Sequence, residues 1–266
     1  MGTRSLAVAV LAASALATSA LTAQMPWTAN LPPHGGALDL LRPKLRGGGT
    51  SLTSLAAYAS ARLPLGPRTT LRFELPVATV STDLSSSTSL GNPYLGLEFG
   101  DTTGLVLDAG FRGPLASESE FAAELGALSD ITRFEAFVPN TVTFAARARY
   151  RFQDPGGSGF QFEAGGGPSF FISTKGGADP DMVLHHHMAA GYRGPNLWWA
   201  VAFAGWTLIT EDAGGVGERT LNEVGASVGL TRGTARPALH LIVPLDDGYN
   251  EEVGIVLGIG IAFTVH

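Results

Sequence analysis

Charged side chains stand at alternate positions within apolar segments of this sequence, an arrangement that suits the binding of polar solutes. Arg147 and Arg149 alternate with alanine and tyrosine, and Arg72 and Glu74 alternate with leucine and phenylalanine. On a pleated strand such residues share one face. Guanidinium and carboxylate groups on one face pair with opposite charges of a solute or with each other. The candidates for this lining are Arg72, Glu74, Glu98, Asp108, Arg147, Arg149, Glu163, His185 and His187.

The run His185-His186-His187 is a second candidate for chemistry. On a strand His185 and His187 share a face, where two imidazoles could bind zinc or copper with His240 as a third ligand. The alternative, which we favour, is two polar histidines near the rim of the same interior. No Ser/His/acid set has a readable spacing, so we expect no enzymatic activity. A barrel lipid hydrolase, which also uses histidine and serine, is the less favoured hypothesis.

Composition limits the function classes. The chain has 266 residues, 45% of them hydrophobic and 15% charged, with 35 glycines and a net charge of −6. It is too apolar to be disordered and too rich in glycine for a helical protein. The negative charge argues against nucleic acid as a partner. The absence of cysteine excludes disulfides, thiolate metal sites and a cysteine nucleophile, and no cofactor is implied.

The first residues predict export. Arg4 precedes an apolar stretch at 6–17, and small residues follow as far as Ala23. This is the layout of a cleaved secretory signal peptide over 1–23; an uncleaved anchor is the alternative. A Pro-rich segment follows at 24–36, either as a plug or as a free tail. After the signal, no apolar stretch is long enough for a transmembrane helix, which needs about 20 residues.

From residue 50 onward the apolar residues recur with period two, which predicts strands. In the last segment Ile255, Leu257, Ile259, Ile261 and Phe263 alternate with small residues. Twelve strands are predicted at 37–44, 51–63, 69–79, 94–100, 104–112, 141–152, 159–171, 182–192, 197–210, 220–231, 235–244 and 253–265.

The connections between these segments alternate between short and mostly longer. The longer connections hold most of the acidic residues, while several arginines and many aromatic residues gather near the short turns. Short periplasmic turns, longer outer loops and aromatic girdles are typical of outer-membrane barrels. A β-sandwich has no reason to keep that rhythm. We therefore predict an all-β, up-and-down antiparallel transmembrane β-barrel over 37–266, with about 12 strands and with 10 or 14 as alternatives.

The barrel prediction also arranges the charges. The lining candidates would face the lumen, where charges tune what passes. Folding the segments 141–152 and 159–171 about their turn predicts Arg147 near Glu163. The early strands supply acidic residues and a later strand supplies arginines, so we predict an acidic wall and a basic wall that face each other across the lumen. Such a pair of walls would favour polar or zwitterionic solutes. The alternative is that the charges neutralise each other and fill a closed lumen.

The longest loop carries a helix signal. Ser117 and Glu120 have the spacing of a capping box, and Phe121, Leu125 and Leu128 follow on one helical face. We predict a short helix at 117–128 that folds over or into the mouth as a constriction. A helix that packs on the outside against neighbouring loops is the alternative.

Two short stretches resemble known barrels. Gly258, Ile261 and Phe263 resemble the C-terminal assembly signal of outer-membrane barrels, which implies insertion by the barrel-assembly machinery; the chain departs from that pattern by continuing to His266. The stretch GNPYLGL at 91–97 resembles the transporter-like barrels associated with phenol-degradation pathways, where aspartate often replaces Asn92. That second resemblance spans under ten residues and implies passage of small, often hydrophobic molecules. It implies no catalytic or ligand residue.

These predictions favour a monomeric, porin-like transport protein of a Gram-negative outer membrane. We expect a narrow channel for a small solute, with outer-membrane lipid and lipopolysaccharide as neighbours of its acidic loops. The alternative is a structural or surface-interaction barrel with a blocked lumen.

Overall fold

The computed structural model is an all-β closed antiparallel barrel of twelve strands with one extra strand. It describes residues 35–46, 52–83, 85–101, 103–116, 121–154, 157–176, 179–210 and 219–264; the predicted signal peptide and Pro-rich segment lie outside these ranges. The strands are β1 (Gly35–Leu45), β2 (Thr53–Gly66), β3 (Thr69–Ser81), β4 (Ser86–Leu90), β5 (Tyr94–Gly100), β6 (Gly104–Arg112), β7 (Thr141–Gln153), β8 (Gly159–Ser173), β9 (Asp181–Arg193), β10 (Leu197–Leu208), β11 (Thr220–Leu230), β12 (Ala235–Pro244) and β13 (Val253–Thr264).

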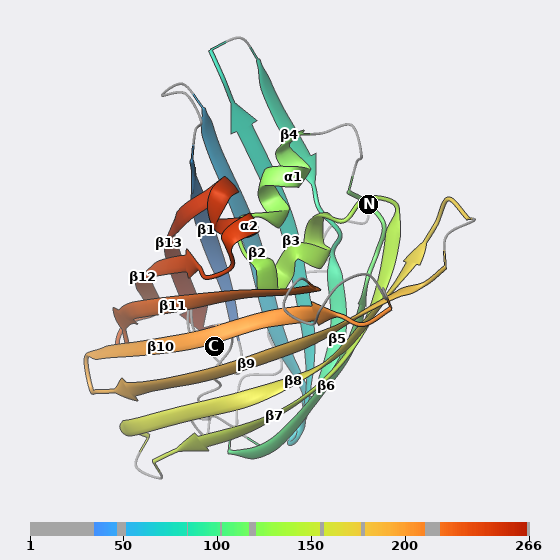
Figure 1. The fold of residues 1–266 in the computed structure, drawn as a ribbon. Coiled ribbons are helices and arrows are strands. Elements are labelled where there is room, and N and C mark those ends of the chain that lie inside the picture. Colours follow the sequence, from blue (N-terminus) through green and yellow to red (C-terminus); the bar gives the residue numbers. More distant parts are fainter. Residues whose placement is uncertain are drawn as a thin grey trace, which may run out of the picture.

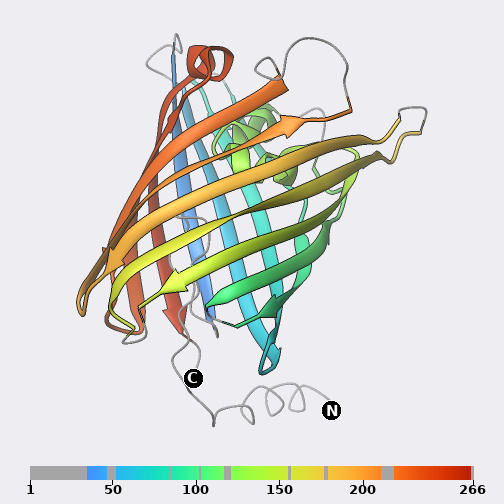
Figure 2. The same ribbon diagram turned by 60° about the horizontal axis from the view of Figure 1, so that its bottom comes forward.

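The barrel closes between its first and last strands. β1 pairs with β13 on one side and with β2 on the other, and the remaining wall strands pair in chain order. Gly35 lies opposite Thr264, so both ends of the barrel wall meet at the end that carries the short turns. We call this the turn end and the opposite end the loop end (Figures 1 and 2). The predicted twelve-stranded up-and-down barrel is confirmed.

The extra strand β4 was not predicted, because the segment 86–90 (SSTSL) lacks apolar alternation. It pairs with the loop half of β3, from Val77 to Ser81, while β5 pairs with the turn half, from Thr69 to Glu74. The long connection between the predicted strands at 69–79 and 94–100 therefore contains a short strand of its own. β4 and β5 therefore both pair with β3, one after the other along its length, and residues 91–93 separate them.

The two faces of the wall have opposite chemistry. Outward side chains are apolar and exposed, as Leu105 (62%), Leu239 (59%) and Ile259 (59%) show. Inward positions of the wall strands carry buried small, polar or charged residues such as Asp39, Arg62 and Glu98. A water-soluble barrel would place these groups the other way round, because exposed apolar area is unfavourable in water. The outward face is therefore suited to hydrocarbon.

The connection between β6 and β7 folds into the barrel. It carries the helix α1 (Phe121–Ala127) and the 3-10 helix η1 (Ile131–Phe137), which lie inside the ring of strands toward the loop end (Figures 1 and 2). We call the described residues 113–116 and 121–140 the inner segment. α1 contacts β2, β3 and β4, while η1 contacts β10 and β11. The inner segment therefore crosses the lumen from one wall to another.

The predicted helix exists in shorter form. Its proposed capping box falls on residues 117–120, outside the described ranges. Leu125 is buried as expected, but Phe121 is half-exposed, and the buried face consists of Ala122, Ala123, Leu125 and Gly126. The predicted apolar face is wrong at Phe121, because small residues allow α1 to lie closer to the wall than a phenylalanine would.

An apolar core fills the loop half of the lumen around the inner segment. Leu125, Ile131 and Phe137 pack with inward residues of several strands, among them Ala78 and Ile242. A second helix, α2 (Asp247–Glu252), covers this core from the loop end, where the Tyr249 hydroxyl donates to the Leu128 carbonyl at 2.7 Å. None of the helices that the structure describes is long and apolar enough to cross a bilayer.

Candidate functional site

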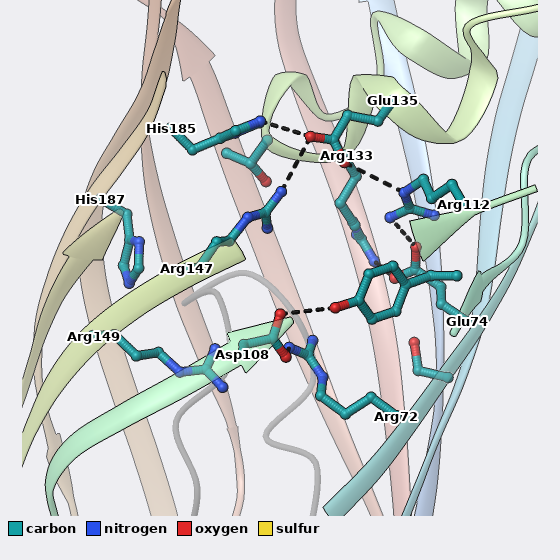
Figure 3. Close-up of a pocket in the computed structure, with 13 residues that line it drawn as sticks. Arg72, Glu74, Asp108, Arg112, Arg133, Glu135, Arg147, Arg149, His185 and His187 are labelled. Atoms are coloured by element: carbon teal, nitrogen blue, oxygen red, sulfur yellow. Dashed lines mark hydrogen bonds and ion pairs between the residues drawn. The ribbon is translucent and has the colours of Figure 1, made fainter. Parts of the chain in front are cut away.

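A polar cavity lies against the inner segment on its charged side (Figure 3). Strands β2, β3, β5, β6, β7 and β9 supply most of its wall, and η1 supplies the rest. The described lining residues are Ser60, Arg72, Glu74, Tyr94, Asp108, Arg112, Thr132, Arg133, Glu135, Arg147, Arg149, His185 and His187. Seven of the nine lining candidates named from the sequence are among them, and the other two, Glu98 and Glu163, bond to the lining residues Arg149 and His187.

Glu135 of η1 connects the inner segment to three strands. Its Oε1 accepts hydrogen bonds from His185 Nε2 at 2.7 Å and from Arg147 Nη2 at 3.3 Å, and its Oε2 lies 3.5 Å from Arg112 Nε. Burial alone would raise the pKa of the Glu135 carboxyl, but Arg147, His185 and Arg112 outweigh burial and hold that pKa below its ordinary value. Glu135 is therefore an anion held by cationic and imidazole donors.

The wall of β3, β5 and β6 forms two compact ion pairs around one tyrosine. Arg112 Nη2 donates to Glu74 Oε1 at 2.7 Å, and Arg72 Nη1 donates to Asp108 Oδ2 at 2.6 Å. The Tyr94 hydroxyl donates to Asp108 Oδ1 at 2.8 Å. The guanidinium groups of Arg72 and Arg112 lie 5.6 Å and 5.3 Å from the centre of the Tyr94 ring. This wall is electrostatically satisfied by its own members.

Arg133 joins the inner segment to the strands on the other side. Its guanidinium lies 3.6 Å from the centre of the Tyr58 ring, and its Nε donates to Asp130 at 2.7 Å. Nη1 lies 3.5 Å from Glu74 and 3.6 Å from Asp39. Burial lowers the pKa of Arg133, but Asp130 and the neighbouring carboxylates outweigh it and raise that pKa. Arg133 is thus a permanent cation tied to β1, β2 and β3.

Glu98 collects three arginines at the turn-end side of the cavity. It accepts hydrogen bonds from Arg62 and Arg149 and lies 3.7 Å from Arg151 Nη2. One carboxylate cannot neutralise three guanidinium groups, and Glu163 is the second acid that Arg151 contacts. The three arginines of β7 thus contact three different carboxylates, Arg147 with Glu135, Arg149 with Glu98 and Arg151 with Glu163.

The predicted proximity of Arg147 and Glu163 is wrong. Glu163 Oε2 accepts from Arg151 Nε at 2.5 Å, and its Oε1 is bonded to His187 Nε2 at 3.0 Å. The register of β7 and β8 sets Arg151 opposite Glu163, four residues from Arg147. Arg147 reaches Glu135 of the inner segment, which strand pairing alone does not reveal.

The prediction of an acidic wall opposite a basic wall is also wrong. Asp108 of β6 stands directly beside Arg147 of β7 in the strand register, and Arg72 of β3 pairs with the same aspartate. Acidic and basic residues therefore interleave around the cavity, because consecutive strands of an up-and-down barrel are neighbours.

Asn92 clamps both ends of the inner segment to the wall. Its Oδ1 accepts from the backbone N–H groups of Leu115 and Ala116, each at 2.8 Å. Its Nδ2 donates to the carbonyls of Val138 at 2.6 Å and Glu135 at 3.2 Å. The side chain is fully buried and sits in the break between β4 and β5. One side-chain amide thus bonds to four backbone groups: two N–H groups shortly after β6 and two carbonyls shortly before β7.

The third histidine considered as a metal ligand lies elsewhere. His240 Nδ1 is bonded to Ser227 Oγ at 2.9 Å, and Nε2 lies 3.9 Å from Asp39 Oδ1. His185 and His187 bond to two different carboxylates, Glu135 and Glu163. Within the described ranges, no group of three histidine, aspartate or glutamate side chains is arranged to hold a metal ion.

Sequence reasoning missed several residues that complete the cavity. Arg62 and Arg112 stand at inward positions near strand ends, so alternation within β2 and β6 could have found them. Arg133 and Glu135 lie on η1, where strand alternation does not apply. The missed charged residues are Arg62, Arg112, Arg133, Glu135 and Arg151.

Comparison with known proteins gives a fold but no family. No protein-family model matches the chain, and no curated protein matches it. Among solved structures, an outer membrane channel from Pseudomonas putida F1 is similar with a TM-score of 0.60 at 12% identity, over 90% of this chain and 98% of that chain. The NanC porin is similar with a TM-score of 0.53 at 9% identity, over 86% of this chain and 100% of that chain. The chain therefore has the fold of outer-membrane β-barrels.

Proposed function

We propose that this protein is a narrow channel for small solutes in a Gram-negative outer membrane. The observation that carries the proposal is the polar cavity, built from charged side chains in a barrel interior and bounded by the inner segment. Charged side chains that line a cavity can exchange contacts with each other for contacts with a polar solute, which the apolar packing in the loop half cannot do. Charged lumen residues tune passage through such barrels.

The proposed placement follows from the outward face. Exposed leucine, isoleucine and aromatic residues surround the barrel, and the short turns belong on the periplasmic side. The acidic loops then meet lipopolysaccharide, whose phosphates divalent cations can bridge to carboxylates. The monomer is exported by its signal peptide and inserted by the barrel-assembly machinery. A catalytic role is not part of this proposal.

A structural barrel with a blocked lumen is the second candidate. It is favoured by the apolar core that Leu125, Ile131 and Phe137 build in the loop half of the lumen. In this case the inner segment is a permanent plug, and the acidic loops are the functional surface. The two candidates differ in whether ions cross the barrel.

Planar-bilayer recording of the purified protein in KCl tests the proposal. We expect small single-channel conductance for the full chain and larger conductance after deletion of residues 117–128, because α1 is part of the obstruction. Deletion of 212–217, in another long connection, is the control and should leave conductance unchanged. A full chain that conducts nothing would support the blocked barrel, and equal conductance with and without 117–128 would remove the constriction.

A further inference from the structure

In the cavity, arginines of β7 and histidines of β9 lie on either side of a strand, β8, whose inward positions between them are glycines. β8 lies between β7 and β9, and its register places Gly165 opposite Arg149 on one side and opposite His187 on the other. Gly167, the next inward position of β8, lies opposite His185. At Gly165 and Gly167, β8 therefore places no side chain of its own between the arginines of β7 and the histidines of β9, which are Arg147, Arg149, His185 and His187 (Figure 3). The carboxylates that meet these two rows of side chains come from Glu135 of η1, which bonds to Arg147 and His185, and from Glu163, which bonds to His187.

The glycine at 165 is required by the close approach of the arginine stem. A Cβ at this position would lie 2.5 Å from the Cβ of Arg149, closer than real Cβ atoms come to one another. Any larger residue would displace Arg149 and occupy the space between the two rows. The strand between the rows is thus built to bring Arg149 and His187 to one cavity.

The arginines of the cavity differ in how fully they are paired. The described lining holds five arginines and three carboxylates, and four further carboxylates that contact lining residues are Glu98, Glu163, Asp130 and Asp39. Arg72 and Arg112 are paired within their own wall, whereas Arg147 and Arg149 share acids with other arginines or with a histidine. The buried Nε–H groups of Arg147 and Arg149, like that of Arg112, have no hydrogen-bond acceptor among the described residues. A guanidinium group with spare donors is a preferred partner of planar oxyanions.

Arg147 is also accessible. Its side chain is 23% exposed, against 9% for Arg149, and it projects into the cavity between the other labelled residues (Figure 3). Its one acidic contact, Glu135 at 3.3 Å, already accepts a shorter bond from His185. A ligand can therefore approach Arg147 without breaking the compact pairs of the opposite wall.

We propose that the carboxylate of a small organic anion binds between Arg147 and Arg149 of β7 and His187 of β9 as the solute crosses the barrel. The inference rests on the proposed channel function and names the class of its solute. It predicts a preference for carboxylates over neutral molecules of the same size, because the recognition is by charge and by the guanidinium fork.

Binding is tested on the detergent-solubilised full chain, without any need for conduction. The probe is sodium benzoate, with benzamide as the neutral molecule of equal size, and the readout is the thermal unfolding midpoint. We expect a saturable rise with benzoate and none with benzamide. In R147Q/R149Q the apparent affinity should fall about tenfold, since hydrogen bonds to charged groups are lost. R68Q, an exposed arginine at a turn, is the matched control and should bind normally.

The variants and outcomes separate this inference from the channel proposal. The gel mobility of the unboiled R147Q/R149Q protein shows whether this double variant folds. If it does not fold, the single variant R147Q, which removes the more exposed arginine, takes its place in the binding test. Equal stabilisation by benzamide, normal affinity of the folded variant, or stabilisation by phosphate but not by benzoate would overturn the carboxylate site. If benzoate binds in detergent but the protein shows no conductance in bilayers, the channel proposal is contradicted while the proposed carboxylate site is supported. In bilayers that conduct, the reversal potential should show anion preference, reduced in R147Q/R149Q.

Discussion

Glu135 illustrates how single residues hold the interior together. One carboxylate on η1 meets Arg112, Arg147 and His185, which project from three different strands. These donors stabilise the anionic form of Glu135. Without them the buried carboxylate would be an unpaired charge, which is costly. The residue therefore links the position of the inner segment to the charge state of the cavity.

This coupling predicts a pH-dependent effect of Glu135→Gln. A carboxyl whose folded pKa is lowered contributes stability that is present above its unfolded pKa and is lost as pH falls toward the folded pKa. We expect the variant to lose about 1–3 kcal/mol near neutral pH and the difference from wild type to narrow below about pH 4. Denaturant unfolding in detergent at pH 7 and pH 3 measures it. Glu124→Gln, exposed on α1, is the control, and a pH-independent difference would contradict the argument.

The inner segment is the element that distinguishes this barrel from an open tube. It leaves the wall after β6, crosses the lumen and returns at β7, and its apolar side packs against β2 and β3. Its two ends meet at Asn92 in the break between β4 and β5. The wall break, the clamp and the inner segment therefore form one structural unit.

Asn92→Ala should loosen this unit without unfolding the barrel. The substitution leaves the N–H groups of Leu115 and Ala116 and the carbonyls of Glu135 and Val138 without their side-chain partner, and an unsatisfied buried group costs about 1–3 kcal/mol. We expect single-channel conductance to rise and to fluctuate more between levels.

The matched control for this variant is Asn196→Ala, at an exposed turn position. It should keep wild-type conductance and wild-type gel mobility. Unchanged conductance in folded Asn92→Ala protein would mean that the apolar packing of α1 alone holds the inner segment in place.

On the scale of the whole molecule, the barrel separates two environments. Outward positions carry apolar side chains on all of the long wall strands, and charged residues are confined to inward positions, turns and loops with few exceptions. The exceptions include Arg42 and Lys44, exposed near the loop end of β1. A hydrocarbon solvent around the middle of the barrel explains this distribution.

The surrounding medium is tested by a pair of substitutions at different depths. The substitutions are Ile259→Arg at the middle of β13 and Leu65→Arg beside the β2–β3 turn. The two native side chains are exposed to a similar degree, 59% for Ile259 and 62% for Leu65. Folding into lipid vesicles should cost about 2–4 kcal/mol for the first and about 0–1 kcal/mol for the second. Denaturant titration read by gel shift measures both. Equal costs would mean that the barrel middle does not lie in hydrocarbon.

The sequence by itself determined the strands, their order and which side chains face inward. Period-two alternation is a local property, so β7 and β13 were predictable from their own residues, and short turns force sequential neighbours to pair. Asn92 and GNPYLGL stood out in the sequence, but nothing local revealed that this amide binds a segment more than twenty residues away. β4 was missed because its polar residues carry no alternation.

Only the tertiary structure decided which charges meet. The barrel brings Glu98 to Arg62 and Arg149, and the inner segment brings Glu135 to Arg147, across separations that no periodicity encodes. Alternation specifies the face of a strand, but the position of a charge within the lumen depends on strand register, barrel closure and the path of a loop. Those are set by packing and backbone pairing over the whole chain, which is why the cavity emerged only from the folded barrel.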